Sequence, residues 1–211
     1  MRTIRKSHEP ANLTEYRTAG GGHYEDYPDK DTLRTYLVND QRGLCCYCLS
    51  RIRAESGTMK TEHWRSQAGS EAGQLDYSNL LGACMGNEGK PIRDQHCDTR
   101  KGNRVISRNP ANPAHRVDEV LRFLDDGRII SNDEVFDDEI NDVLNLNLAF
   151  LKNNRKAVLT AFMEALPRRR TLSRTQLERW LREWNGDSGA AELPPFCQVV
   201  VYWLRRRLSR P

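Results

Sequence analysis

Four of the six cysteines in this sequence have the spacing of metal ligands. Cys45 and Cys48 stand in the stretch LCCYCLS, and two thiolates at this spacing can bind one zinc ion from a tight turn. Cys84 and Cys97 follow in two later segments. Four sulfurs from separate segments predict a closed, tetrahedral structural zinc site. The interval between the last two ligands is long for such a site and implies an inserted loop.

The other two cysteines receive no role from their spacing. Cys46 could replace Cys45 as a ligand, but its spacing to Cys48 is less favourable. Cys197 lies far away, near the end of the chain. The alternative interpretation is that all six are reduced, buried or incidental thiols without a metal.

A carboxylate stands beside an imidazole at Glu62 and His63, between the two groups of cysteines. A neutral imidazole can deprotonate water near pH 7. Asn79 and Asp98 come later, and a pair of carboxylates with open coordination positions suits Mg²⁺, which prefers oxygen ligands. Taken singly, each residue has a structural explanation: a surface pair, a turn amide, or a helix cap at Asp98. Together, and interleaved with the cysteines, they indicate a hydrolytic site.

The order of these motifs is Cys-x-x-Cys, Glu-His, Asn-Leu, Cys and Cys-Asp-x-x-Lys, and it resembles the HNH nuclease family. The fold of that family is a ββα-metal motif, a hairpin and a helix around one divalent ion, and many members add a four-cysteine zinc knuckle. The resemblance makes His63 the general base, and Glu62 and Asp98 the ligands of a catalytic Mg²⁺ or Mn²⁺. It makes Asn79 the residue whose side-chain oxygen bonds and orients the imidazole.

The resemblance also suggests residues that contact the substrate. Lys101 would point toward phosphate, and Arg65 and His96 are further candidates. The chain departs from the family pattern in two places. The helix residue that is often His or Asn is here Asp98, and the second histidine precedes Cys97 instead of following it.

A narrower resemblance covers roughly residues 1–110 and carries the stretches MRTIRKSHEPANLTEY, CCYC, KTEHWRSQ, LDYSNLLGACMG and QHCDTRKGN. These are similar to the PtuB-like HNH proteins of Septu anti-phage systems, including those encoded beside retrons. The resemblance implies a PtuA-type ATPase of the ABC class as partner, with a retron reverse transcriptase and its RNA–DNA product as further candidates. DNA is the expected substrate, and RNA, such as tRNA, is the alternative.

Composition and charge limit the other function classes. The 211 residues carry a net charge of +4 and 37% hydrophobic residues, which fits a soluble chain able to bury a core. No apolar run approaches the roughly 20 residues needed to cross a bilayer, and the start lacks the apolar core of a signal peptide. We therefore expect a cytoplasmic protein.

Two other functions compete with the nuclease of a defence complex. One is a non-catalytic zinc module that binds nucleic acid or a scaffold partner. The other is a stand-alone restriction or homing nuclease, which would need a base-reading domain that we do not find.

The elements that must position these residues are predicted as an α+β arrangement in three segments. Residues 1–30 are predicted as an extended N-terminal arm, 31–131 as the HNH nuclease domain with its zinc knuckle, and 132–211 as a mostly helical region that docks a partner. Periodicity predicts a hairpin within residues 117–131. Ser173 and Gln176 predict a capping box at the start of a late helix.

Overall fold

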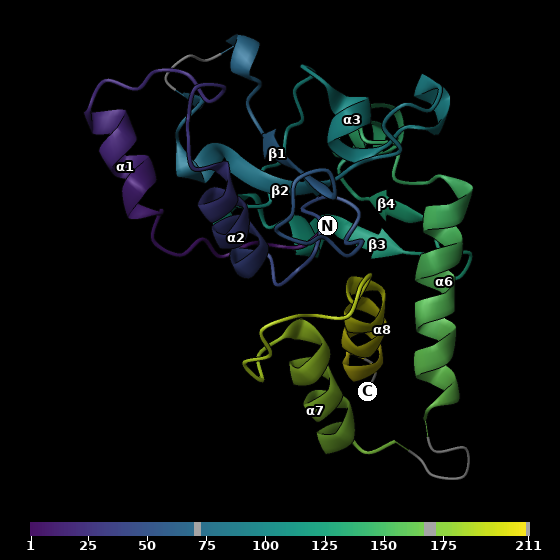
Figure 1. Ribbon diagram of the computed structural model, residues 1–211. Coiled ribbons are helices and arrows are strands. Elements are labelled where there is room, and N and C mark those ends of the chain that lie inside the picture. The colour runs from purple at the N-terminus through teal and green to yellow at the C-terminus, as the bar shows by residue number, and fades with distance from the viewer. Residues whose placement is uncertain (70–72, 167–171, 210–211) are drawn as a thin grey trace.

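The computed structural model describes residues 1–69, 73–166 and 172–209 and has a mixed α+β architecture (Figure 1). Two small antiparallel sheets, β1–β2 and β3–β4, lie among short helices. The principal elements are, in chain order, α1 Ala11–Thr18, α2 Lys30–Asp40, β1 Met59–His63, β2 Leu80–Cys84, α3 Cys97–Lys101, α4 Val117–Val120, β3 Leu121–Phe123, β4 Ile129–Ser131, α5 Glu134–Asp138, η6 Glu139–Val143, α6 Ala149–Glu164, α7 Arg174–Asn185 and α8 Gln198–Leu208.

The hairpin β1–β2 and the helix α3 form the unit that carries most of the candidate site. Glu62 pairs with Leu81 and His63 with Leu80 in the antiparallel register, so the carboxylate and the imidazole stand at the end of β1. Helix α3 packs against β2. A hairpin followed by a helix is the order of elements that the HNH resemblance predicts.

One buried glutamine ties helix α2 to this hairpin. Gln41, which follows α2, is only 4% exposed. Its Oε1 accepts a hydrogen bond from the Gly82 N–H at 2.6 Å, and its Nε2 donates to the carbonyls of Gly82 and Leu44 at 2.7 Å each. The side-chain amide thus satisfies main-chain groups of β2 that no neighbouring strand pairs.

The C-terminal third is helical, as predicted. Helices α6 and α7 both pack against α8; in Figure 1 α7 and α8 lie below the strands, and α6 runs down the right-hand side. The predicted capping box is confirmed, because Ser173 and Gln176 exchange side-chain and main-chain hydrogen bonds at the start of α7. Phe162 of α6 makes edge-to-face contacts with three tryptophans, and these are Trp180, Trp184 and Trp203.

The predicted hairpin within residues 117–131 is present but shorter than expected. Residues 117–120 form the helical turn α4, and the strands are Leu121–Phe123 and Ile129–Ser131. Gly127, with φ of 84°, lies in the turn between them, where an added Cβ would meet the main chain of Lys152 at 2.1 Å. Tertiary packing against α6 therefore decides the shape of this turn.

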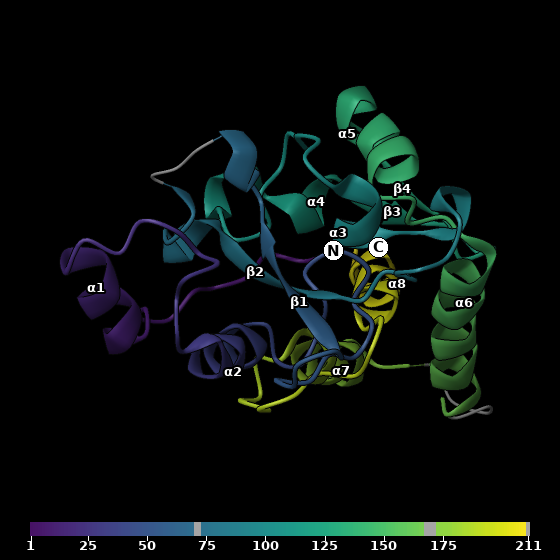
Figure 2. The same ribbon diagram turned by 45° about the horizontal axis from the view of Figure 1, so that its top comes forward.

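The N-terminal segment is not a fully extended arm, because residues 11–18 form helix α1. Met1 and Ile4 belong to the main hydrophobic core together with Val200 of α8, and Leu13 of α1 lies in a second cluster. The N-terminus accordingly lies in the middle of the molecule in both ribbon views (Figure 2). The main core draws residues from all three predicted segments, so they pack as neighbours.

Among the described residues, none of the helices combines the length and the apolar character that crossing a lipid bilayer requires.

Replacing Gln41 with alanine should destabilise the protein by at least about 2 kcal/mol, because it leaves buried main-chain groups of Gly82 and Leu44 without partners. Urea unfolding followed by circular dichroism measures this change. Asn39→Ala, at an exposed position of the same helix, is the matched control and should change the free energy of unfolding by less than about 0.5 kcal/mol. Equal effects of the two substitutions would contradict the role of the amide.

Candidate active site and metal centre

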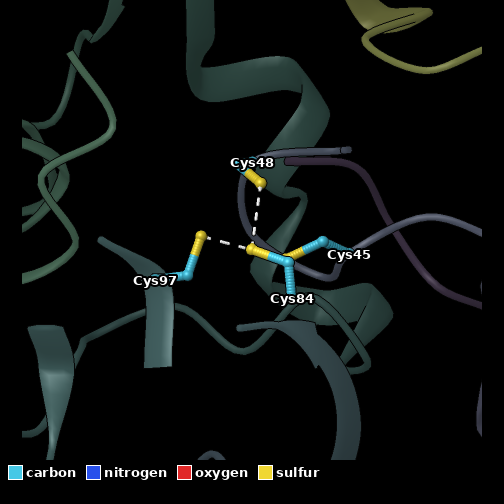
Figure 3. Close-up of side chains that lie close together, drawn as sticks. All are labelled: Cys45, Cys48, Cys84 and Cys97. Carbon is cyan, nitrogen blue, oxygen red and sulfur yellow. Dashed lines mark hydrogen bonds between the residues drawn. The ribbon is translucent and has the colours of Figure 1, made fainter. Parts of the chain in front are cut away.

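Four cysteine sulfurs converge on one point, as the sequence predicts (Figure 3). The Sγ atoms of Cys45 and Cys97 lie 3.8 Å apart, those of Cys48 and Cys84 lie 3.7 Å apart, and all four are within 4.8 Å of one another. Sulfurs bound at about 2.3 Å to a tetrahedral zinc ion are about 3.8 Å from each other. The cluster is therefore the right size to hold a metal ion such as zinc.

A tight turn presents the first two ligands. The Cys45 N–H donates to the Ser50 carbonyl at 2.9 Å, and the Leu49 N–H donates to the Cys45 carbonyl at 3.2 Å. Leu49 has a φ of 66°, in the left-handed region that closes such turns. The Cys46 N–H donates to the Gly82 carbonyl at 2.9 Å, which fastens the turn to strand β2.

Hydrogen bonds within the cluster favour the thiolate at two of its four cysteines: they lower the pKa of Cys45 and Cys48, and they raise the pKa of Cys84 and, together with burial, of Cys97. Burial raises the pKa of the Cys48 thiol, but hydrogen bonds from Cys84 and Cys97 outweigh this effect and bring the pKa to about 6. The thiolate is the form that binds metal. Burial raises the pKa of Cys46 and of Cys197, and both lie outside the four-sulfur cluster.

His96 lies against the cysteine cluster and not in a substrate groove. It is 4% exposed, and its Nδ1 is 3.1 Å from the Cys97 Sγ and 4.0 Å from the Cys84 Sγ. Its ring also packs edge-to-face on Phe150. The prediction of a substrate contact is wrong for this residue, because the turn into α3 directs its side chain inward. An N–H group at this distance can donate to a metal-bound sulfur.

Glu62 is a buried carboxylate with two strong partners. It is 2% exposed, and its Oε1 accepts a hydrogen bond from the Tyr47 hydroxyl at 2.6 Å and lies 2.9 Å from the Lys101 Nζ. Tyr47 is fully buried and belongs to the cysteine turn. The prediction that Lys101 points toward phosphate is wrong, because a carboxylate buried this deeply holds the ammonium beside it.

Asp98 brings a second carboxylate to Glu62. It directly follows Cys97 in α3, and it is partly exposed. Burial raises the pKa of Glu62 well above its usual range, and a hydrogen bond to Asp98 and its charge add to the effect, while Lys101 opposes it. Asp98 and Lys101 thus act on Glu62 in opposite directions, and the two carboxyl groups are oxygen donors of the kind that Mg²⁺ or Mn²⁺ prefers.

The imidazole of His63 is held by groups other than the predicted one. It is 6% exposed, its Nε2 lies 3.0 Å from the Gln74 carbonyl, and its Nδ1 lies 3.2 Å from the Gln67 Nε2. A carbonyl only accepts, so the neutral ring carries its proton on Nε2 and its lone pair on Nδ1. Burial lowers the pKa of His63, and the Gln74 carbonyl and Asp98 only partly offset this, which favours the neutral base.

Asn79 supports the loop after β1 instead of bonding the imidazole. Its Oδ1 accepts from the Arg65 N–H at 2.8 Å, and its Nδ2 donates to the carbonyls of Arg65 and Gly73 at 3.0 and 2.9 Å. The expected bond to His63 is therefore replaced by bonds to the main chain on either side. Arg65 itself is exposed, with its guanidinium over the ring of Trp64 at 5.5 Å.

Sequence reasoning missed Tyr47, Gln67 and Gln74. Tyr47 lies between Cys45 and Cys48, where an aromatic residue is expected to belong to the hydrophobic core. Nothing in the motif shows that its hydroxyl reaches Glu62. Gln74 acts through its main-chain oxygen, which no side-chain pattern can reveal. Gln67 lies four residues after the histidine in KTEHWRSQ, and this short interval was the one signal available.

The comparisons with known proteins agree with part of this description. No protein-family model matches the chain. A curated protein of Escherichia coli named "Retron Ec83 putative HNH endonuclease" is 30% identical over 98 residues. The match covers 41% of this chain and 38% of that relative, so the chain spans well under half of the relative's length in the alignment. The similarity suggests a nuclease, and the narrower PtuB-like resemblance stays a prediction.

Removal of one cluster sulfur should abolish zinc binding. Cys84→Ser is expected to lose zinc to EDTA dialysis and to lower the free energy of unfolding by several kcal/mol, because metal binding at a structural site is part of the folding energy. Elemental analysis and calorimetry measure the two effects. Cys46→Ala, next to a ligand in the same turn, should keep one zinc per chain. Retention of zinc by Cys84→Ser would refute the assignment.

Proposed function

We propose that this chain is a metal-dependent endonuclease of the HNH type, which hydrolyses phosphodiester bonds in nucleic acid. The observation that carries the proposal is the placement of three residues on one hairpin and helix that the cysteine cluster joins: Glu62 and His63 adjoin at the end of β1, and Asp98 lies in the first turn of α3. The charge of Asp98 acts to raise the pKa of both Glu62 and His63. In this interpretation the hairpin and α3 are a ββα-metal core, and the cluster is its zinc knuckle.

The residues divide the chemistry among them. His63 would act as general base through the lone pair of Nδ1, with the Gln74 carbonyl fixing the tautomer. The Gln67 side-chain amide now donates to that lone pair, and it would move aside so that the attacking water can bind there. Glu62 and Asp98 would hold Mg²⁺ or Mn²⁺, which when bound supplies positive charge at the scissile phosphate.

The candidates for phosphate contacts are the exposed Arg65 and Arg104 and the partly buried Arg100, and not Lys101. Arg100 and Arg104 lie in and just after α3, close to Asp98, and their guanidinium groups donate to main-chain carbonyls. Neither forms an ion pair with a carboxylate of the described chain. Partial burial and the charge of Arg100 lower the pKa of Arg104, as expected for two neighbouring cations. With Arg65, they leave positive charge around the site for a nucleic-acid backbone.

We take DNA as the substrate class. RNA is the alternative, and the assay must include it, because a site that contacts phosphates more than bases does not reveal which nucleic acid it cleaves. We also infer that the nuclease works in an anti-phage assembly with a PtuA-type ATPase. This inference rests on the resemblance of the N-terminal half to PtuB-like proteins and on the retron in the name of the matched relative. A retron reverse transcriptase with its RNA–DNA product is a further partner implied by the same resemblance.

His63→Ala should lower metal-dependent cleavage by about 10²- to 10⁴-fold, because the general base is lost. Nicking of plasmid DNA and cleavage of RNA, in Mg²⁺ and in Mn²⁺, measure this with the chain alone and with the co-expressed ATPase. His8→Ala, at an exposed position, is the control and should cleave like the wild type. If His63→Ala and the wild type behave alike in every arm, the chain is a non-catalytic zinc module.

Replacing both Arg100 and Arg104 with glutamine should reduce the slope of log Kd against log salt concentration by about 1 to 2. Each phosphate contact to duplex DNA contributes about 0.9 to this slope, and the double substitution removes up to two contacts. Fluorescence anisotropy in a His63→Ala background measures the slope without cleavage. The control is the double substitution of Arg174 and Arg179, which pair with glutamates on the distant helix α7. An unchanged slope would place the nucleic acid elsewhere.

A further inference from the structure

Lys101 places a buried ammonium group inside the candidate active site. Its side chain is 1% exposed, and its Nζ lies 2.9 Å from the Glu62 Oε1. The ammonium also donates to the main-chain oxygens of His63 at 3.1 Å and of Gly102 at 3.5 Å. A lysine anchored by three oxygens at this depth cannot reach a nucleic-acid backbone without leaving its place. The nuclease function described above does not use it.

The two strong partners of the Glu62 carboxylate share one of its oxygens. Both strong partners, the Tyr47 hydroxyl and the Lys101 ammonium, lie on Oε1. Neither of these two donors is bonded to Oε2, and Asp98 adjoins the same carboxyl group. The two donors fix the orientation of the carboxylate and leave Oε2 and the Asp98 carboxylate for a cation.

We propose that Lys101 is the resident counter-ion of this carboxylate pair. It balances Glu62 when no divalent cation is bound and, with Tyr47, keeps the carboxylate oriented when one binds. The inference rests on the metal site of the proposed function and makes Lys101 a positioning residue instead of a substrate contact.

The counter-ion has a predictable effect on the affinity for the divalent ion. Two carboxylates with one ammonium leave a single negative charge for the incoming cation, and the ammonium repels that cation at short range. Lys101 thus stabilises the metal-free protein and weakens metal binding. A neutral side chain of similar length would reverse both effects, since the uncompensated carboxylates would then depend on the metal.

Binding of Mn²⁺ to the zinc-loaded protein at pH 8, followed by electron paramagnetic resonance of the free ion, tests the inference. Lys101→Met should bind Mn²⁺ about tenfold more tightly than the wild type. It should also gain more thermal stability than the wild type on addition of Mn²⁺. The double variant Glu62→Gln with Lys101→Met should recover the stability of the metal-free protein and bind Mn²⁺ at least about tenfold more weakly than Lys101→Met.

Arg155→Met is the matched control, because Arg155 is also a buried cation but bonds the carbonyls of Gly127 and Leu146 and the side chain of Asn147. It should destabilise the protein and leave the affinity for Mn²⁺ unchanged.

Equal or weaker binding of Mn²⁺ by Lys101→Met than by the wild type would overturn the inference. If Lys101→Met folds only in Mn²⁺, the inference is supported, and if it stays unfolded at saturating Mn²⁺ the inference is overturned. Because the assay contains no nucleic acid, its outcome is separate from that of the nuclease. If Lys101→Met binds Mn²⁺ more tightly but the wild type cleaves no nucleic acid, the counter-ion role of Lys101 is supported and the proposed nuclease function is refuted.

Discussion

The meeting of four cysteine sulfurs is the interaction on which the rest of the structure depends. Strands β1 and β2 have five residues each, and α3 also has five. A two-stranded hairpin and a single helical turn are too short to be stable alone. Cys84 ends β2 and Cys97 begins α3, so a metal bound there would fix the hairpin and the helix to each other. The turn with Cys45 and Cys48 adds a third segment to the same point.

This cluster also determines where the two carboxylates stand. Asp98 is covalently next to the ligand Cys97, so the start of α3 carries both a sulfur for one ion and an oxygen for the other. Tyr47 stands beside the ligand Cys48 and reaches Glu62 with its hydroxyl. A cluster of four sulfurs therefore positions two carboxylates, one through a peptide bond and one through a hydrogen bond. The two sites remain chemically distinct, because hard cations prefer oxygen and zinc accepts sulfur.

The sequence was sufficient for features that depend on spacing. The four metal-ligand candidates and the capping box of α7 follow from local patterns, and each lies where the pattern puts it. It was insufficient for the directions of Lys101, His96 and Asn79. Motif order does not say which side of a five-residue helix faces the core, and burial of Glu62 decides where the lysine goes. The bonds of Asn79 depend on a loop that returns from residue 65 to residue 73.

A buried carboxylate–ammonium pair of this kind trades stability for orientation. Removing a carboxylate and an ammonium from water costs several kcal/mol per ion, and their attraction repays this only when further hydrogen bonds complete the geometry. Here Tyr47 and the main-chain oxygen of His63 complete it, one on the carboxylate and one on the ammonium. Apolar residues of similar size would fill the same space at lower cost. In the proposed nuclease these charges would hold Glu62 and Asp98 ready for a cation, while the cysteine cluster and the shared hydrophobic core supply stability.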